Sequence, residues 1–445
     1  MSEDNRSRLK QWLQSGEARL HPLAFPQREL WEASPVAVGD VANHICAFIN
    51  VRGPIVIKDC EIAVQRVVER HEVLRSSFLP GKAGPLQMVR SSGTANSRYR
   101  ELSASEAQPE ALEEVMGEIF AQPFDMVRGP LYRVEMLQRG PDDLVMALAI
   151  HHAIADGWTL GVFVQDLVTA YIQSKHKQGT ALPPVPCSYS DWAAAERAYW
   201  QPQLLAERAA FWKDRLSGSR PLWDSPLEAG PLQRRVTAVP ETLTAAVREL
   251  ARSTSTTLFS TLLTAFQRTL SKWTGKEDIT VGTPVANRHK PTTRETMGYF
   301  AGNVPLRTQV DHRQPFALAV RQGHEATMDA FANAMPFAEL TQALGDAPAP
   351  GHHPVYSVRF ALQNHPVPDV TLPGLSLQLR MRSTGTARFD LGCEVTEDGT
   401  GLEVVWLYRR CLFDQSDIET LNHLFGTVLS EACGSPIVGA VALSI

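Results

Sequence analysis

The clearest pattern in the chain is a pair of strand-like segments followed by a helical repeat of apolar positions. Leu131 to Leu137, and the unbroken apolar run from Leu144 to Ile150, predict two strands, which are connected through Gly140-Pro141-Asp142, a turn sequence. The apolar positions that follow recur at helical spacing: Leu160, Phe163, Val164, Leu167, Val168, Tyr171 and Ile172. The sequence therefore predicts strand, strand, short loop and amphipathic helix, in this order.

Strand and helix patterns also alternate along the rest of the chain. Helices are predicted over Asp59 to His71 and Thr256 to Trp273, and a short strand over Ile279 to Val281. Leu391 to Val395 and Leu402 to Leu407 flank an Asp-Gly turn and predict a hairpin. The mixture indicates an α/β protein.

A proline-rich segment suggests where the chain divides. Gly179 to Pro186 combines one glycine with three prolines and is the best candidate for an interdomain linker. The 445 residues are enough for at least two domains of ordinary size. We predict an N-terminal half over residues 1–180 and a C-terminal half over residues 181–445.

Composition and charge exclude several function classes. The net charge of −5 gives no reason to expect the basic face of a nucleic-acid binder. The apolar run from Leu144 to Ile150 is far shorter than the ~20 residues that span a bilayer, so we expect no membrane segment. The six cysteines are scattered, without metal-type spacing, and the polar N-terminus is unlike a secretory signal. These features favour a cytoplasmic protein.

Candidate chemistry is concentrated between the second apolar strand and the helix that follows it, in His151-His152-Ala153-Ile154-Ala155-Asp156-Gly157-Trp158. A histidine can take or give a proton near neutral pH, which suits acyl transfer to an amine or alcohol. Asp156 could fix the turn, Gly157 permits close backbone approach, and the N–H groups of the next helix could stabilise an oxyanion. Adjacent histidines on a strand point to opposite faces, so a shared zinc ion is a poor alternative.

The octapeptide resembles the HHxxxDG signature of the condensation domains of non-ribosomal peptide synthetases. Acetyltransferases and wax-ester synthases share that signature, but further segments resemble the other six condensation motifs in order. These segments are Leu23 to Trp31, Arg70 to Phe78, Tyr189 to Trp192, Val281 to Arg288, Gly298 to Arg307 and Arg388 to Leu391. The resemblance covers nearly the whole chain.

The resemblance implies a fold and a set of site residues. It implies two chloramphenicol acetyltransferase-like lobes in a V-shaped pseudo-dimer, with an active-site tunnel at their junction. His152 is expected to face that tunnel, either as general base on the nucleophile or as a positioning group. Asp156 is expected to pair with Arg288, and we group His152, Asp156 and Gly157 as the candidate catalytic residues.

Supporting roles are expected for other residues. His151 is expected to support the loop. Arg75 is either an ordering or channel arginine or a surface charge at a helix end, and the sequence leaves both readings open. Asn303 is expected to satisfy local backbone groups, with substrate contact as the alternative. The pair His352-His353 matches no motif and is expected in an exposed loop.

The resemblance also implies the reaction and the partners. We expect transfer of an acyl group from a carrier-protein phosphopantetheine thioester to an amine or a hydroxyl. A hydroxyl nucleophile can belong to a small molecule that is not bound to a carrier. No cofactor is implied on the enzyme itself, and acidic carrier proteins are the expected partners, by way of local basic patches. No carrier or adenylation motif is found in the sequence, so we expect either a discrete enzyme or an excised domain, and the initiator methionine favours the discrete enzyme. The alternatives are an acyl-CoA-dependent acyltransferase and a non-catalytic recruitment module.

Overall fold

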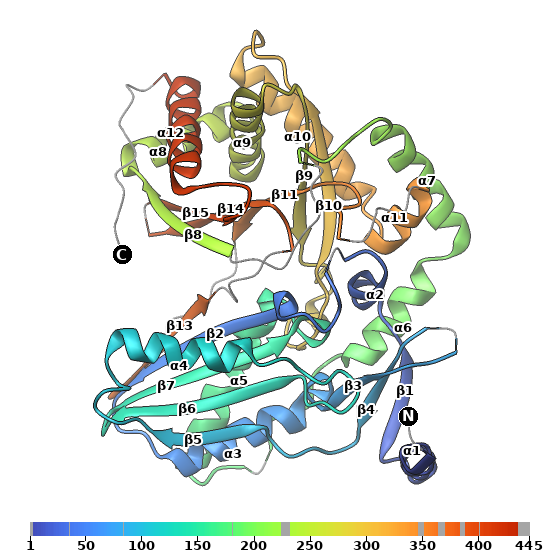
Figure 1. Ribbon diagram of the computed structural model, residues 1–445, viewed down its shortest axis with the longest axis vertical. Helices are drawn as coiled ribbons and strands as arrows, with labels where there is room; N and C mark the ends of the chain where they lie inside the picture. The colour runs from blue at the N-terminus through green and yellow to red at the C-terminus, as the bar shows by residue number, and fades with distance from the viewer. Residues whose placement is uncertain are drawn as a thin grey trace.

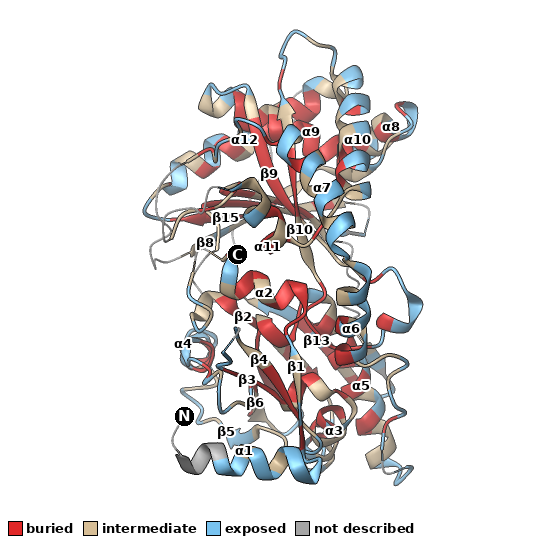
Figure 2. Cartoon of the chain, turned by 90° about the vertical axis from the view of Figure 1, so that its right-hand side faces the viewer, coloured by how far each residue is buried: buried red, intermediate tan, exposed pale blue. Residues whose placement is uncertain are grey.

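The computed structural model describes residues 3–434, apart from 35, 83, 180, 224–231, 346–350, 364–369, 383–387 and 400. The chain forms two lobes, each built on a six-stranded sheet, and they lie one above the other in Figure 1. Buried residues gather along the strands and the inner helix faces of each lobe (Figure 2), so each lobe has its own hydrophobic core. The mixed α/β fold that the sequence predicts is confirmed.

The N-terminal lobe contains the predicted pair of strands at the centre of its sheet. Its strand order is β12-β13-β2-β7-β6-β5. The bounds are β2 (His44–Arg52), β5 (Ser97–Glu101), β6 (Tyr132–Gly140), β7 (Asp143–His151), β12 (Val370–Leu372) and β13 (Leu375–Arg382). Strand β7 is buried from Leu144 onward because neighbouring strands and packed helices cover it, which explains its unbroken apolar run.

Helices and a small second sheet complete this lobe. The helices are α1 (Glu3–Ser15), α2 (Phe25–Glu32), α3 (Ile57–Arg70), α4 (Pro109–Ala121) and α5 (Gly157–Lys175), with short 3₁₀ turns η1 (Val41–Asn43), η2 (Glu72–Arg75) and η3 (His152–Ile154). The small sheet has the order β1-β4-β3, with β1 (Ala18–Pro22), β3 (Ser76–Leu79) and β4 (Leu86–Arg90). The predicted helices after residue 59 and after the double histidine are both present as α3 and α5.

The C-terminal lobe places helices on one face of its sheet. The strand order is β10-β9-β11-β14-β15-β8, with β8 (Leu232–Val239), β9 (Asp278–Val285), β10 (Gly302–Gln309), β11 (Val358–Gln363), β14 (Leu391–Asp398) and β15 (Gly401–Arg409). Its helices are α7 (Pro202–Arg215), α8 (Glu241–Ser253), α9 (Leu258–Thr274), α10 (Phe316–Ala332), α11 (Phe337–Leu344) and α12 (Gln415–Ala432), with the turn η4 (Pro291–Thr293). Helix α6 (Tyr189–Tyr199) precedes them in the chain but packs in the N-terminal core through Tyr189 and Ala193. In Figure 1, α8, α9, α10 and α12 lie on the side of this sheet that faces away from the N-terminal lobe.

The two lobes exchange chain segments. Strand β13 comes from the C-terminal half but pairs antiparallel with β2, and it buries Leu377 and Leu379 in the N-terminal core. Ala33, on the other side, packs in the C-terminal core. The predicted domain boundary at residue 180 therefore stays a prediction. The N-terminal sheet contains strands from both sides of that boundary.

The cysteines and the helix lengths were also considered in the sequence, and the structure describes both. All six cysteines are free thiols. Among the described residues, no helix combines the length and the apolar character needed to cross a bilayer.

Candidate active site

The double histidine lies where β7 ends, and its two imidazoles have different surroundings. His151 is fully buried; its Nε2 donates to the carbonyl of Val38 at 2.7 Å, and its Nδ1 accepts from the N–H of Ala153 at 3.0 Å. These partners require a neutral ring with the proton on Nε2. Burial lowers the pKa of His151 to about 3, so the ring stays neutral. His151 therefore supports the turn.

His152 instead lines a cavity. Its ring stands edge-on to Tyr299, with 4.7 Å between the ring centroids. Burial, together with nearby Arg388, holds the pKa of His152 well below its ordinary value, so the imidazole is neutral at pH 7. Its Nδ1 is buried without a hydrogen bond from another described residue. The two rings therefore lie on different sides, as the alternation along the strand predicts, and the division of tasks between them stays a prediction.

The cavity, of about 90 Å³, is built from both lobes. The N-terminal half supplies His152, Glu29 of α2, and Ser34 just beyond that helix. The C-terminal half supplies the 299–303 segment, the 353–359 segment, and Arg388 with Phe389. Two cationic side chains, Arg359 and Arg388, face it, so an anion forming inside would be electrostatically stabilised. The site is a junction of the lobes, which neither half could make alone.

Asp156 connects the two halves next to the cavity without lining it. Its carboxylate caps α5 through the N–H of Thr159 at 3.0 Å and accepts from the N–H of Phe300 at 3.1 Å. The Nη2 of Arg288 lies 3.1 and 3.2 Å from the two carboxylate oxygens, with both side chains almost fully buried. The guanidinium also donates to the carbonyls of Thr293 and Thr296, and it lies 3.9 Å from the ring centroid of Phe300. The expected pair is present, and it fastens the 288–300 loop to the start of α5.

The other candidate catalytic residues do not reach the cavity. Asp156 and Gly157 are absent from its lining, as is every residue of α5. Gly157 is exposed at the first position of the helix. Among the three residues grouped as catalytic, only His152 lines the cavity, so an oxyanion inside it would not meet the N-terminus of α5.

The sequence matches the family model for the condensation domain over residues 17–440. The chain belongs to the condensation-domain family. It is 28% identical over 441 residues to a linear gramicidin synthase protein of Brevibacillus parabrevis, a match that covers 95% of this chain and 6% of that protein. It is also 28% identical over 428 residues to the phosphinothricin tripeptide synthetase PhsC of Streptomyces viridochromogenes, covering 93% of this chain and 39% of that protein.

Solved structures agree on the fold. The X-domain from teicoplanin biosynthesis superposes with a TM-score of 0.81 at 21% identity, covering 95% of this chain and 97% of that one. The chain thus spans less than half the length of these two curated synthetases but 97% of the solved X-domain. It is a condensation domain of the kind found in non-ribosomal peptide synthetase systems.

Arg75 and Asn303, the two remaining supporting residues of this condensation domain, both form side-chain hydrogen bonds. Arg75 is half-buried, and its guanidinium donates to the backbone carbonyls of Val68, Glu69 and Arg90, so it orders the end of α3 against β4. It does not line the His152 cavity. Asn303 does line it, but its amide donates to the Glu29 carboxylate at 2.7 Å and not to the backbone, which corrects the expected role.

Two cavity residues were missed or misplaced by the sequence analysis. The expectation that His352-His353 forms an exposed loop is wrong for His353, which is buried and lines the cavity; burial lowers its pKa to about 4. Glu29 was not singled out, yet it is buried in the cavity wall on α2. Burial raises the pKa of Glu29 to about 7, although Arg388 and Asn303 oppose the shift. A charged residue inside the first motif, on the buried face of a short helix, was the available signal.

Proposed function

We propose that this condensation domain transfers an acyl group from a carrier-protein phosphopantetheine thioester to an amine or hydroxyl nucleophile, forming an amide or an ester in natural-product biosynthesis. The observation that carries the proposal is the cavity at the junction of the lobes. It brings His152 of the HHxxxDG signature together with Arg388 of the seventh motif and Asn303 of the sixth. Three motifs far apart in sequence meet in one cavity.

The chemistry follows from the charges around His152. A neutral imidazole accepts a hydrogen bond from the attacking N–H or O–H group and orients its lone pair toward the thioester carbonyl. The new C–N or C–O bond forms as the carbonyl oxygen becomes anionic, and Arg388 and Arg359 favour that charge. The C–S bond then breaks, and the proton lost by the nucleophile passes to the departing thiolate.

The same two arginines disfavour a persistent imidazolium. We therefore propose that His152 acts mainly by positioning the nucleophile and relaying its proton, and does not store charge. Phosphopantetheine arrives as part of the substrate, on carrier proteins acting as partners. Free thiols at all six cysteines are consistent with a cytoplasmic setting.

The experiment is a mass-spectrometric product assay with a panel of amines and alcohols. The same acyl group is offered on a carrier protein and on coenzyme A. Product formed faster from the carrier-bound donor supports the proposal, and its mass gives the nucleophile class. Preference for the coenzyme A donor favours the acyl-CoA-dependent alternative. Carrier protein that binds, but whose acyl group is never transferred, favours a recruitment module.

A further inference from the structure

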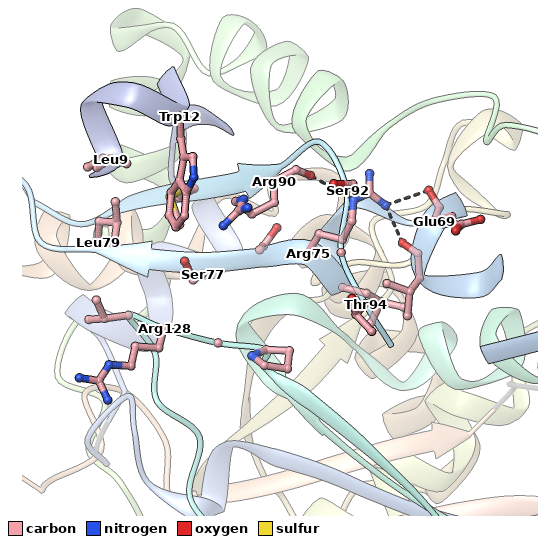
Figure 3. Close-up of a pocket in the computed structure, with 18 of the residues that line it drawn as sticks. Leu9, Trp12, Glu69, Arg75, Ser77, Leu79, Arg90, Ser92, Thr94 and Arg128 are labelled. Atoms are coloured by element: carbon pink, nitrogen blue, oxygen red, sulfur yellow. Dashed lines mark hydrogen bonds between the residues drawn. The ribbon is translucent and has the colours of Figure 1, made fainter. Parts of the chain in front are cut away.

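A second and much larger pocket lies in the N-terminal lobe, beside α1 and the small sheet. It has a volume of about 740 Å³ and shares no lining residue with the His152 cavity. Its walls come from α1, the end of α3, strands β3 and β4, and residues 127–130 (Figure 3). Arg75 of the second motif forms part of one wall and is occupied by three backbone carbonyls.

The lining of this pocket is positively charged. Four arginines and one glutamate line it, namely Arg8, Arg75, Arg90, Arg128 and Glu69. Arg128 is largely exposed, with a loose 3.8 Å ion pair to Asp125. Arg90 is more enclosed, and its guanidinium lies 3.8 Å from the ring centroid of Trp12. Both side chains are labelled in Figure 3. The charge balance favours an anionic ligand.

Two buried polar atoms in the wall lack hydrogen-bond partners among the residues that the structure describes. They are Nε of Arg90 and Oγ of Ser77, and Ser77 is only 3% exposed. Buried polar groups are nearly always satisfied, so each such atom requires an explanation. Both residues line the pocket, which is where a partner could enter.

The sheet register brings these two residues to one face. Ser77 on β3 pairs directly with Met88 on β4, and Arg90 lies two residues beyond Met88. Because side chains two residues apart on a strand share a face, Ser77 and Arg90 are diagonal neighbours, with Cα atoms about 7–8 Å apart. One carboxylate group can therefore meet both side chains.

The same face supplies an apolar surface. Leu79 and Met88 lie on it and are buried with Ala18 in a small cluster against which Leu9 and Trp12 pack. Two arginines lie near the indole, since Arg8 also lies 4.9 Å from the Trp12 ring centroid. Leu79 and Met88 both line the pocket, so its wall offers aliphatic surface beside the arginines.

We propose that this pocket binds a small amphipathic carboxylic acid, with its carboxylate between Arg90 and Ser77 and its aliphatic chain against Leu79 and Met88. The positive lining disfavours a neutral apolar ligand, and the aliphatic wall gives no reason for inorganic phosphate to bind well. Binding here needs no acyl transfer in the His152 cavity, so the site stands or falls independently of the proposed function.

The test is isothermal titration calorimetry on the full chain with octanoate, octanamide and inorganic phosphate. Octanamide matches octanoate in shape but lacks its charge. We expect octanoate to bind at least tenfold more tightly than either comparison ligand. Equal binding of octanamide, tighter binding of phosphate, or no octanoate binding at millimolar concentration overturns the proposal.

Variants place the binding in the pocket. Arg90→Met keeps an unbranched side chain and is expected to weaken octanoate binding at least tenfold, while Ser77→Ala weakens it several-fold. Arg98→Met, which removes a largely exposed arginine on β5, is the matched control and should leave the affinity unchanged. If Arg90→Met does not fold, the octanoate affinity of Ser77→Ala compared with that of Arg98→Met tests the site. Unchanged affinity in every variant that folds would refute this site.

Discussion

Replacing Asp156 should damage the fold before it damages the chemistry. In Asp156→Ala, the Arg288 guanidinium keeps its buried place but loses the carboxylate 3.1 Å away. An uncompensated buried charge of this kind costs about 3–5 kcal/mol of unfolding free energy. Loss of the α5 N-cap to the N–H of Thr159 adds about 1 kcal/mol. The total is about 4–6 kcal/mol.

Thermal unfolding measures this loss. For a unit of 150–250 residues, each kcal/mol shifts the midpoint by about 2–4 °C, so Asp156→Ala should lower it by roughly 8–24 °C. Asp156→Asn retains an acceptor for the cap, so its unfolding midpoint should fall by less than that of Asp156→Ala. The double variant Asp156→Ala/Arg288→Met no longer buries a lone charge and should unfold at a higher temperature than Asp156→Ala.

Activity decides between a structural and a chemical role. At a temperature where every variant is folded, the acyl-transfer rate should stay close to that of the wild type across the Asp156 series, and it should fall only where a variant begins to unfold. A rate lost in Asp156→Ala with a midpoint lowered by less than about 2 °C would refute the reasoning, because it would place the carboxylate among the reacting groups.

His152→Gln keeps a polar side chain but no basic nitrogen, so the acyl-transfer rate should fall about 10²–10⁴-fold while the unfolding midpoint stays in place. Glu29→Gln should flatten the dependence of stability on pH. The carboxyl binds its proton more tightly when folded (pKa about 7) than its ordinary value of 4.5, so its stabilisation is full below that ordinary value and is lost as pH rises through 7. This carboxyl should therefore make the free energy of unfolding of the wild type roughly 3 kcal/mol larger at pH 4 than at pH 8, a difference that Glu29→Gln should lack and that urea unfolding at the two pH values measures. Arg75→Leu removes three hydrogen bonds to backbone carbonyls and should lower the free energy of unfolding by about 1.5–3 kcal/mol. The activity per folded molecule should stay unchanged.

Each of these predictions has a clear contrary result. An unfolding midpoint that falls in His152→Gln would give this ring a structural role like that of His151. A stability profile of Glu29→Gln that parallels the wild type would mean that Glu29 is not protonated in the folded cavity. Arg98→Leu, which removes a largely exposed arginine, is the control for Arg75→Leu, and equal stability of the two variants would contradict the ordering role.

Local patterns in the sequence predicted the elements that position His152. The apolar run of β7 and the periodicity of α5 predict a turn between them, and alternation along the strand predicts that His151 and His152 face apart. These inferences succeed because they depend on neighbours in the chain. The Asp156–Arg288 pair spans 132 residues and came from the family resemblance, not from local pattern.

The rest of the cavity depends on contacts that local pattern does not encode. Strand β13 crosses to the N-terminal sheet because its alternate leucines find an open edge beside β2, and its own sequence does not specify that partner. The hydrogen bond from Asn303 to Glu29 joins residues 274 positions apart. His353 is buried and lines the same cavity as His152 of the other lobe. Polar residues brought together at the junction of two lobes were therefore the part that sequence reasoning missed.

The central claim is that acyl transfer takes place in the cavity between the lobes, with His152 in contact with the reactants. The most direct measurement is single-turnover mass spectrometry of an acyl-loaded carrier protein, with wild type and His152→Gln run side by side and the nucleophile identified by the panel. The account predicts that the wild type unloads the carrier with matching appearance of product, and that the folded variant does so at least about 100-fold more slowly. Equal rates for the two folded proteins would contradict the account and place the reaction elsewhere.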